Sequence, residues 1–394
     1  MQYDFNKPID RWDNNAVKYD EMEQKYGRRD LVPMWIADMD LCTAQPIMDA
    51  MDARNRQGMF GYTSRPDSYF ESVCQWQEKH NGWRPDPARC IFSLGVVPAI
   101  CTCVREFSQP GDEILFLTPV YGEFFDSVEN WDRKPLTVSL IEQDNHYTLD
   151  FDAFEEALKR RPPLFILCHP HNPVGKVWSE EELRRMGELC VKYGTLIISD
   201  EIHSDLMLFG NKHIPIASLG EKIAENTITC TSATKTFNLA GLQAATIIFP
   251  NQELIAKYQK FWKSLDVHRN NCFSLVAVEA AFRHGEEWLT QLLAHLESNV
   301  LYVEGFLREN IPEITMARPE CTYLLWLNCK GLNLPGDALP NFMVEKARLA
   351  LNDGRAFGKE DGEGYMRMNI ACPRSTVEKA LSQLKQAVDQ HMGR

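Results

Sequence analysis

Short apolar runs alternate with longer amphipathic segments through the middle of the chain. An apolar run of four to eight residues between polar segments is typical of a strand buried on both faces. Repeated alternation of such strands with amphipathic helices predicts a mostly parallel sheet with helices on both faces. The expected strands are Glu113–Leu117, Leu164–Cys168, Thr195–Ser199, Thr227–Thr231 and Ala244–Phe249.

The segment Ser179–Tyr193 represents the helices expected between these strands. It opens with Ser179, a favourable N-cap residue, and three glutamates follow in what would be the first turn. Its apolar residues then recur at helical spacing, at Leu183, Met186, Leu189 and Cys190. In sheets of this kind ligands bind beyond the carboxyl ends of the strands, so the chemistry is expected there.

The two ends of the chain have a different pattern. Residues 1–46 combine loops with a short helix and show no strand–helix repeat. The C-terminal part predicts a smaller α+β domain, with helices at Glu286–Asn310 and Ser375–Met392 and strands at Glu313–Ala317, Thr322–Leu327 and Tyr365–Ile370. We therefore expect a large domain over residues 47–288, and a small domain made of residues 289–394 and the returning segment 1–46.

Composition narrows the class of protein. The 394 residues are 44% hydrophobic and 25% charged, which is ordinary for a soluble globular protein, and a net charge of -13 argues against nucleic acid or an anionic membrane as a partner. The start of the chain lacks the features of a secretion signal, and no apolar run approaches the roughly 18–20 residues that span a bilayer. The 12 cysteines form no Cys-x-x-Cys pair, so we expect free thiols in a cytoplasmic protein.

Three polar residues stand at or just beyond the ends of predicted strands. Asn172 precedes Asp200 by 28 residues, and Asp200 precedes Lys235 by 35. This order suits a pyridoxal phosphate site, where a lysine forms the Schiff base, an aspartate keeps the pyridine nitrogen protonated and an asparagine bonds the ring oxygen. Taken alone, Lys235 could be a surface lysine and Asp200 a helix N-cap; their occurrence together favours the cofactor site.

Other residues could complete such a site. The strand, glycine turn and helix start around Phe92–Ile100 would direct the free amides of Val96 and Val97 at a phosphate, with Pro98 at the first helical position. Ser232 would donate its hydroxyl to the same phosphate. His203 could bond the ring oxygen beside Asn172, although a lone histidine is more often structural.

Two further residues have an ordinary interpretation as well as a functional one. Tyr121 could stack on a pyridine ring or be a core tyrosine. Arg367, in an alternating strand, could grip a substrate carboxylate or be a solvated edge residue, with Arg374 as the alternative anchor. The stretch Cys168-His169-Pro170-His171 leads into Asn172 and lacks the ligands of a metal shell, so no metal is expected.

Together these residues resemble the fold-type I pyridoxal phosphate enzymes of the class I/II aminotransferase superfamily. The resemblance spans about residues 3–390 and is greatest to the MalY/PatB-type cystathionine β-lyases. The segments that carry it are Met34-Trp35-Ile36-Ala37-Asp38-Met39-Asp40, Phe60-Gly61-Tyr62-Thr63, Gly95-Val96-Val97-Pro98-Ala99-Ile100, Asp200-Glu201-Ile202-His203-Ser204-Asp205 and Arg367-Met368-Asn369-Ile370-Ala371-Cys372-Pro373-Arg374. It implies a seven-stranded, mostly parallel sheet sandwiched by helices, with a smaller α+β domain.

The resemblance also implies site roles and an assembly. Ala37, Asn172 and Arg367 would bind the substrate, and Tyr121 would join Lys235 and Asp200 in catalysis. Tyr62 would reach the phosphate of the neighbouring subunit, which implies a homodimer with shared active sites. Many relatives carry a phosphate-binding arginine eight residues beyond the lysine, where this chain has Gln243.

The implied activity is a carbon–sulfur β-lyase that eliminates a thiol from cystathionine, cysteine or related amino acids, with pyruvate and ammonia as the other products. An aminotransferase is the nearest alternative, since the same catalytic residues serve it. A cofactor-binding regulatory protein is the second, disfavoured because Lys235, Asp200 and Arg367 are all present.

Overall fold

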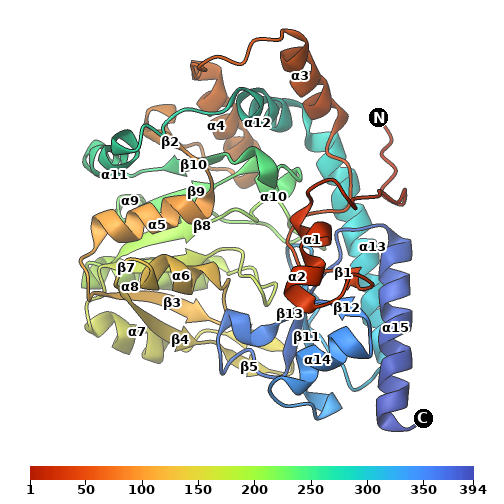
Figure 1. Cartoon of the computed structure of the whole chain (residues 1–394). Helices are drawn as coiled ribbons and strands as arrows, with labels where there is room; N and C mark the ends of the chain where they lie inside the picture. Colours follow the sequence, from red (N-terminus) through yellow and green to blue (C-terminus); the bar gives the residue numbers. More distant parts are fainter.

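A seven-stranded sheet forms the centre of the large part of the molecule in the computed structural model, which describes residues 1–394 (Figure 1). Its strand order is β2-β10-β9-β8-β7-β3-β4, and β10 alone runs antiparallel to its neighbours. The predicted mostly parallel sheet is confirmed. The strands are β2 (Cys90–Ser93), β3 (Glu113–Thr118), β4 (Lys134–Ser139), β7 (Leu164–Cys168), β8 (Leu196–Asp200), β9 (Thr227–Thr231) and β10 (Ala245–Ile248).

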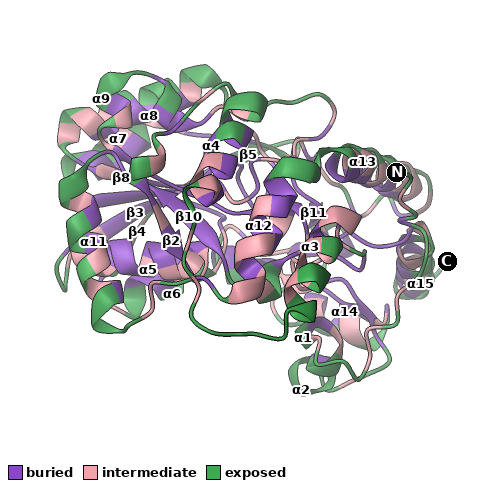
Figure 2. Ribbon diagram, turned by 90° about the horizontal axis from the view of Figure 1, so that it is seen from above, coloured by how far each residue is buried: buried purple, intermediate pink, exposed green.

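Alternate side chains of these strands enter two separate cores. In β3, Ile114 and Phe116 pack on one face with α5, α6 and α11, whereas Leu115 and Leu117 pack on the other with α7 and α8. Figure 2 shows these helices buried toward the sheet and exposed outward. Their bounds are α5 (Val96–Phe107), α6 (Glu123–Glu129), α7 (Phe151–Lys159), α8 (Glu180–Tyr193) and α11 (Gln252–Ser264).

The cap predicted for α8 is present. The Ser179 side chain accepts from the Glu182 backbone N–H, and the Glu182 carboxylate accepts from the Ser179 N–H, which forms a capping box. Because the cap fixes where α8 begins, it also fixes the connection that leads from β7 through Asn172 to the helix.

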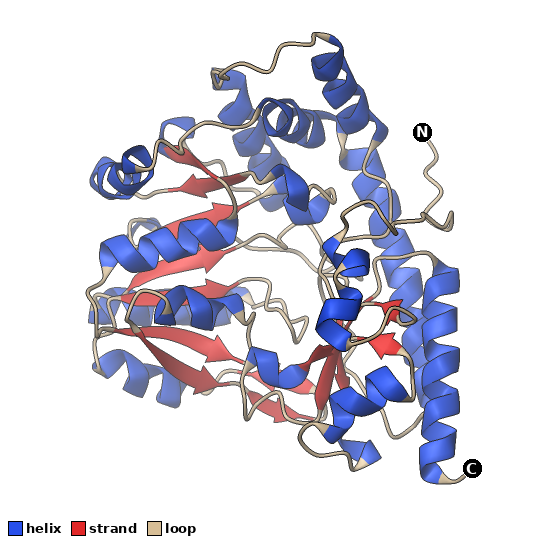
Figure 3. Cartoon of the chain, in the orientation of Figure 1, coloured by secondary structure: helices blue, strands red, loops and turns tan.

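The C-terminal part forms a smaller α+β unit, in which a long helix and the final helix back an antiparallel sheet of order β11-β14-β13 (Figure 3). The N-terminal segment joins it, since β1 pairs with β12 in parallel. The elements are α1 (Val17–Asp20), α2 (Met22–Tyr26), β1 (Val32–Pro33), α13 (Glu286–Asn310), β11 (Leu324–Asn328), α14 (Ala338–Glu345), β12 (Leu349–Ala350), β13 (Asn352–Asp353), β14 (Tyr365–Asn369) and α15 (Arg374–Met392).

One predicted strand is wrong. The segment Glu313–Ala317 forms only an isolated bridge, in which Thr315 exchanges hydrogen bonds with Asn328. Pro312 and Pro319 flank the segment and cannot donate to a ladder, so pairing does not extend.

The remaining elements connect these two parts. α3 (Gln45–Arg56) and α4 (Asp67–Asn81) both pack against α12 (Cys272–His284). The short elements are β5 (Ile141–Gln143), β6 (His146–Thr148), α9 (Glu221–Ala224) and α10 (Ala233–Thr236). The domain boundaries near residues 47 and 289 stay a prediction, since α13 runs without interruption through the second of them. None of the helices combines the length and apolar character needed to cross a membrane.

Candidate active site

A cavity of about 210 Å³ opens at the carboxyl ends of the central strands. It brings together most of the residues predicted from the sequence, although they lie up to 198 positions apart in the chain. Its polar and predicted lining residues are Ala37, Val96, Val97, Tyr121, Asn172, Asp200, His203, Thr234, Lys235 and Gln243.

Lys235 lies on the short helix α10 directly after β9. Its Nζ donates to the backbone oxygen of Ala37 at 2.6 Å, and no carboxylate forms an ion pair with it. Burial lowers the pKa of Lys235 to about 8, and the positive charge of Arg367 acts in the same direction. A substantial fraction of the amine is therefore neutral near physiological pH, as a nucleophile or base requires.

Asp200 ends β8 and is 5% exposed. Its Oδ1 accepts from the Ile202 backbone N–H at 3.1 Å, but no cationic side chain pairs with it. Burial raises the pKa of Asp200 to about 7. A buried carboxylate without a cation is costly, so this site is suited to a positively charged ligand group.

Arg367 extends from β14 toward the same cavity. Its Nη1 donates to Asn172 Oδ1 at 3.3 Å, Nη2 contacts Asn352 Oδ1 at 2.9 Å, and Nε has no partner. Burial lowers the pKa of Arg367 to about 10. No acidic side chain neutralises this buried guanidinium, so it can receive an anionic group. Arg374, the alternative anchor, instead bonds Asn299 and Ser298 on α13.

Two polar side chains flank these residues. His203 is 4% exposed, its Nδ1 has no partner, and burial lowers its pKa to about 3, which keeps the ring neutral. Burial raises the pKa of Tyr121 to about 12, so its phenol stays protonated. A neutral imidazole and a neutral phenol can each donate one hydrogen bond to a ligand in the cavity.

The start of α5 also borders the cavity. An α-helix leaves its first amides without intrahelical partners, so Val96 and Val97 offer free N–H groups there. Pro98 stands at the third helical position rather than the first, and it still gives up only an amide that would have no partner. Ser232 caps α10, and its hydroxyl donates to the Ala244 oxygen at 2.6 Å, so its contact with a phosphate stays a prediction.

The sequence reasoning missed how the segment of residues 34–41, here called the strap, is held over Lys235. Asn369 donates to the oxygens of Ile36 and Asp38, and Asn238 to those of Met39 and Leu41. Arg367 donates to Trp35, and Tyr323 donates to Ala37 at 3.0 Å. These contacts join parts of the chain that are far apart in sequence. The local sequence around each donor side chain therefore does not indicate that it binds the strap.

A buried ionisable pair behind Asp200 was also missed. Because side chains alternate along β8, Ser199 and Glu201 point away from Asp200. Glu201 pairs with His213 at 2.8 Å and accepts from Ser199 at 2.8 Å, and all three are buried. Burial raises the pKa of Glu201 and lowers that of His213, so the pair is close to neutral. The Asp200-Glu201 dipeptide was the only signal for it.

Neighbouring histidines do not form a metal site. His169 bonds the Ile214 oxygen and His171 the Pro119 oxygen, and burial lowers the pKa of both rings. The structure brings together no group of three or more His, Cys, Asp or Glu side chains that could hold a metal ion.

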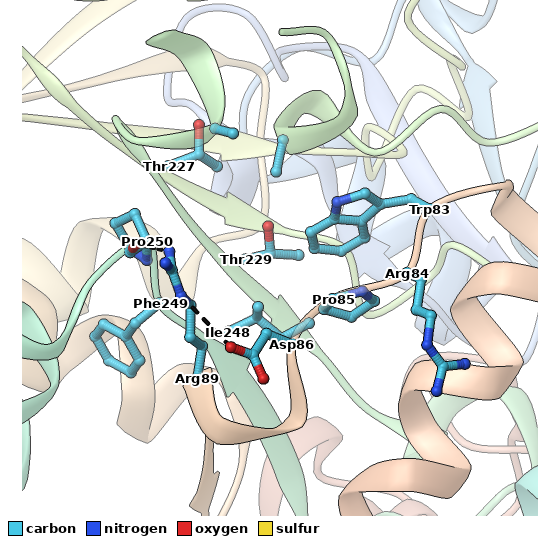
Figure 4. Close-up of a pocket in the computed structure, with 12 residues that line it drawn as sticks. Trp83, Arg84, Pro85, Asp86, Arg89, Thr227, Thr229, Ile248, Phe249 and Pro250 are labelled. Atoms are coloured by element: carbon cyan, nitrogen blue, oxygen red, sulfur yellow. Dashed lines mark hydrogen bonds and ion pairs between the residues drawn. The ribbon is translucent and has the colours of Figure 1, made fainter. Parts of the chain in front are cut away.

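A second pocket of about 210 Å³ lies at the other end of the central strands, away from the first cavity; Figure 4 shows its lining residues. It is formed where β9 begins at Thr227 and β10 ends near Pro250, beside an ion pair of Arg89 with Asp86. No lysine lines this pocket, so it offers no amine for a Schiff base, whereas the first cavity contains Lys235.

Comparison with known proteins places this geometry in a family. Residues 36–384 match the family described as aminotransferase class I and II. The chain belongs to this family. It is 39% identical to cystathionine beta-lyase PatB of Bacillus subtilis, over 98% of this chain and 99% of that protein.

Two solved structures are also similar. Cystalysin of Treponema denticola, which contains pyridoxal 5'-phosphate, has a TM-score of 0.96 at 32% identity and covers 99% of this chain and 100% of its own. The PLP-bound C-S lyase of Staphylococcus hominis has a TM-score of 0.92 at 31% identity, covering 98% of both chains. The fold and family predicted from the sequence are confirmed.

Proposed function

We propose that the chain is a pyridoxal phosphate-dependent carbon–sulfur β-lyase. Its substrates are cystathionine, cysteine and related S-substituted amino acids, and its products are a thiol, pyruvate and ammonia. One observation carries the proposal: the buried, unpaired carboxylate of Asp200 and the partly buried amine of Lys235 share one cavity, in a chain whose relatives include a cystathionine beta-lyase and PLP-bound C-S lyases.

The residues of the cavity fit this cofactor. The unpaired Asp200 carboxylate suits a protonated pyridine nitrogen, and the amides of Val96 and Val97 suit the phosphate. Asn172 and the unpartnered His203 would bond the ring oxygen, and Tyr121 would stack on the ring. Bound at Lys235, the cofactor supplies an electron-withdrawing ring that stabilises negative charge at the substrate α-carbon.

The chain's own groups then perform the proton transfers. Lys235, whose pKa is lowered to about 8, is basic enough to accept the α-proton at Nζ and acidic enough to pass it to the departing thiolate. Arg367 holds the substrate carboxylate through its two-pronged guanidinium, with Asn172 beside it. Ala37, whose oxygen contacts Lys235, lines the side of the cavity where the amino acid would lie.

An aminotransferase remains the second candidate, because the matched family bears that description and the same residues would serve it. The two activities differ in the fate of the substrate. A lyase releases pyruvate and thiol without any keto-acid acceptor, whereas an aminotransferase requires one. A regulatory protein that only binds the cofactor is disfavoured, since Lys235, Asp200 and Arg367 are all present.

We propose further that the active enzyme is a cytoplasmic homodimer with shared sites. Tyr62 lies in the connection between α3 and α4, is 96% exposed and does not line its own chain's cavity. An exposed tyrosine close to Phe60, which is also exposed, is suited to contact a second chain. All twelve cysteines are free, which supports a reducing compartment.

Two measurements on the purified protein test the function. Borohydride reduction should fix the cofactor on the peptide that contains Lys235; fixation on another lysine would contradict the site. Incubation with cystathionine should release pyruvate and thiol without added keto acid. Products that form only when a keto acid is supplied would identify an aminotransferase.

A further inference from the structure

The backbone oxygen of Ala37 accepts hydrogen bonds from two side-chain donors at once. Lys235 Nζ lies 2.6 Å from it, and the Tyr323 hydroxyl lies 3.0 Å from it. A carbonyl oxygen has two lone pairs, so both bonds can form together. Since both donors share one oxygen, the phenol hydroxyl and the lysine amine lie within 6 Å of each other.

The strap holds this oxygen in place. Asn369 bonds the oxygens on either side of it, those of Ile36 and Asp38, both at 2.6 Å. The Asn238 side chain accepts from the backbone N–H of Met39 and donates to the backbone oxygen of Met39. The Ala37 carbonyl is therefore fixed by its neighbours and cannot simply follow Lys235 when the amine moves.

Tyr323 is placed by an unfavourable backbone conformation. The preceding residue, Thr322, has a φ of 66°, which is rare for a β-branched side chain. Its N–H donates to the Leu206 oxygen at 2.7 Å, and its hydroxyl accepts from the Leu324 N–H. Such strain persists where surrounding contacts enforce it, and it is concentrated at functional sites. Tyr323 itself is 1% exposed, with its ring near His203.

Several charged and titratable groups face Lys235 from the surrounding elements. Arg367 of β14 lowers its pKa, whereas Asp38 of the strap and Asp200 of β8 raise it. His203 is neutral, and burial keeps the phenols of Tyr121 and Tyr323 protonated, since it raises the pKa of both. None of these side chains hydrogen-bonds to the lysine amine, which instead donates to the Ala37 carbonyl.

We propose that Tyr323 is a positioning residue that controls the basicity of Lys235 through the Ala37 carbonyl. The phenol occupies one lone pair of that oxygen and fixes its direction, so the carbonyl receives the lysine ammonium but does not hold it too tightly. The inference rests on the proposed role of Lys235 as the base and extends it to a residue outside the cavity lining.

The direction of the effect follows from the competition between the two donors. Without the phenol hydroxyl, the Ala37 oxygen would accept from Lys235 alone and become a stronger acceptor for its charged form. The pKa of Lys235 would then rise, and less of the neutral amine would be present at neutral pH. Tyr323→Phe keeps the ring and removes only this hydroxyl.

The first test measures Lys235 directly. Protein stripped of cofactor is acylated briefly at a series of pH values, and the extent of labelling of the Lys235 peptide is read by mass spectrometry. Tyr323→Phe should move the midpoint up by about 0.5–1 pH unit, the scale of a fraction of one charge-assisted hydrogen bond. An unchanged midpoint, or a lower one, would overturn the proposal.

The second test uses the cofactor-loaded enzyme. In Tyr323→Phe, kcat should fall about three- to tenfold near pH 7 with little change in KM, and should recover at higher pH, since a tenfold loss of neutral amine corresponds to one pH unit. A loss that is equal at all pH values would indicate a merely structural role and would contradict the proposal.

Tyr26→Phe is the matched control. The Tyr26 hydroxyl also donates to a backbone oxygen, that of Leu351, at 3.0 Å, but this carbonyl does not contact Lys235. The control should keep the wild-type midpoint and pH profile. If borohydride marks a different lysine, the proposed function fails; if it marks Lys235 and the midpoint of Tyr323→Phe is unchanged, only the present inference fails.

Discussion

At the scale of single residues, the site contains opposite charges that are buried and left unpaired. Asp200 and Arg367 are each buried, and neither forms an ion pair with another side chain. In a structure that must first be stable, such groups are a cost. Their placement around one cavity indicates that a ligand carrying both signs of charge compensates for them.

The cost gives a prediction for Asp200→Asn. The pKa of Asp200 is raised to about 7 in the folded protein, above its value in the unfolded chain. Ionisation of this carboxyl therefore lowers the free energy of unfolding as the pH rises from about 4 to 7. In the cofactor-free protein the amide should therefore stabilise the fold by roughly 2–4 kcal/mol above pH 7, and by nothing near pH 4. Chemical denaturation at the two pH values measures the difference.

The same variant should lose activity. A neutral amide cannot keep the pyridine nitrogen protonated, so turnover should fall on the order of 10²-fold or more, as for the loss of one strong electrostatic contact in a transition state. Near-normal turnover would rule out the role given to Asp200.

Arg367→Ala should mainly weaken amino-acid binding. Loss of a buried charge-assisted pair costs about 2–5 kcal/mol, so kcat/KM should fall by at least about 30-fold. Arg374→Ala is the control, because Arg374 bonds Asn299 and Ser298 away from the cavity and its loss should leave kcat/KM near the wild-type value. A larger effect at Arg374 would reverse the two assignments.

Much of the candidate site was predictable at this scale, because Asn172, Asp200 and Lys235 each follow a buried apolar run at the same edge of the sheet. Tyr323, Asn369 and Asn238 were not predictable. Their side chains form hydrogen bonds to the backbone of the strap. Because every residue has a backbone oxygen, the sequence does not indicate which oxygen a distant side chain will bind.

At the scale of elements, the strands with continuous apolar runs were predicted best. β7, β9 and α13 have the predicted bounds, whereas β4 was missed. β4 is an edge strand in which most positions are at least partly exposed, so its sequence lacks an apolar run. Local pattern therefore identifies the buried centre of the sheet better than its edge.

A close approach between elements gives a further prediction. A side chain at Gly285, where α12 meets α13, would collide with the ring of Phe237, two residues after Lys235. Gly285→Ala should therefore destabilise the fold by about 1–3 kcal/mol and reduce activity as α10 shifts. Thermal unfolding and turnover of the purified variant would measure both effects.

Gly305→Ala serves as the comparison, because it lies within α13 and its added methyl group would meet nothing within 4 Å. This variant should be neutral or more stable by up to about 1 kcal/mol, from helix propensity alone. Equal effects at the two glycines would contradict the close contact with Phe237.

At the scale of the whole molecule, the proposed dimer can be tested by mixing two impaired chains. Lys235→Ala and Tyr62→Phe homodimers are unfolded and refolded together. If Tyr62 serves the partner's site, each hybrid contains one intact site, and mixed refolding should recover up to about a quarter of wild-type activity, since about half of the dimers are hybrids.

If Tyr62 acts within its own chain, every site in the hybrid carries one defect and no activity returns. The experiment requires that Tyr62→Phe alone is clearly impaired. Hybrids that are verified by mass and remain inactive would remove Tyr62 from a shared site.

The strap has a consequence for how the protein is made. Ala37 leaves the ribosome roughly 290–330 residues before Tyr323, Arg367 and Asn369, which hold the strap. During synthesis, the large sheet can form as its strands emerge, while the strap must wait for partners that do not yet exist. A nascent or truncated chain that stops before Asn369 therefore lacks the side chains that hold the strap, so amino-acid cleavage should begin only after Asn369 has been translated.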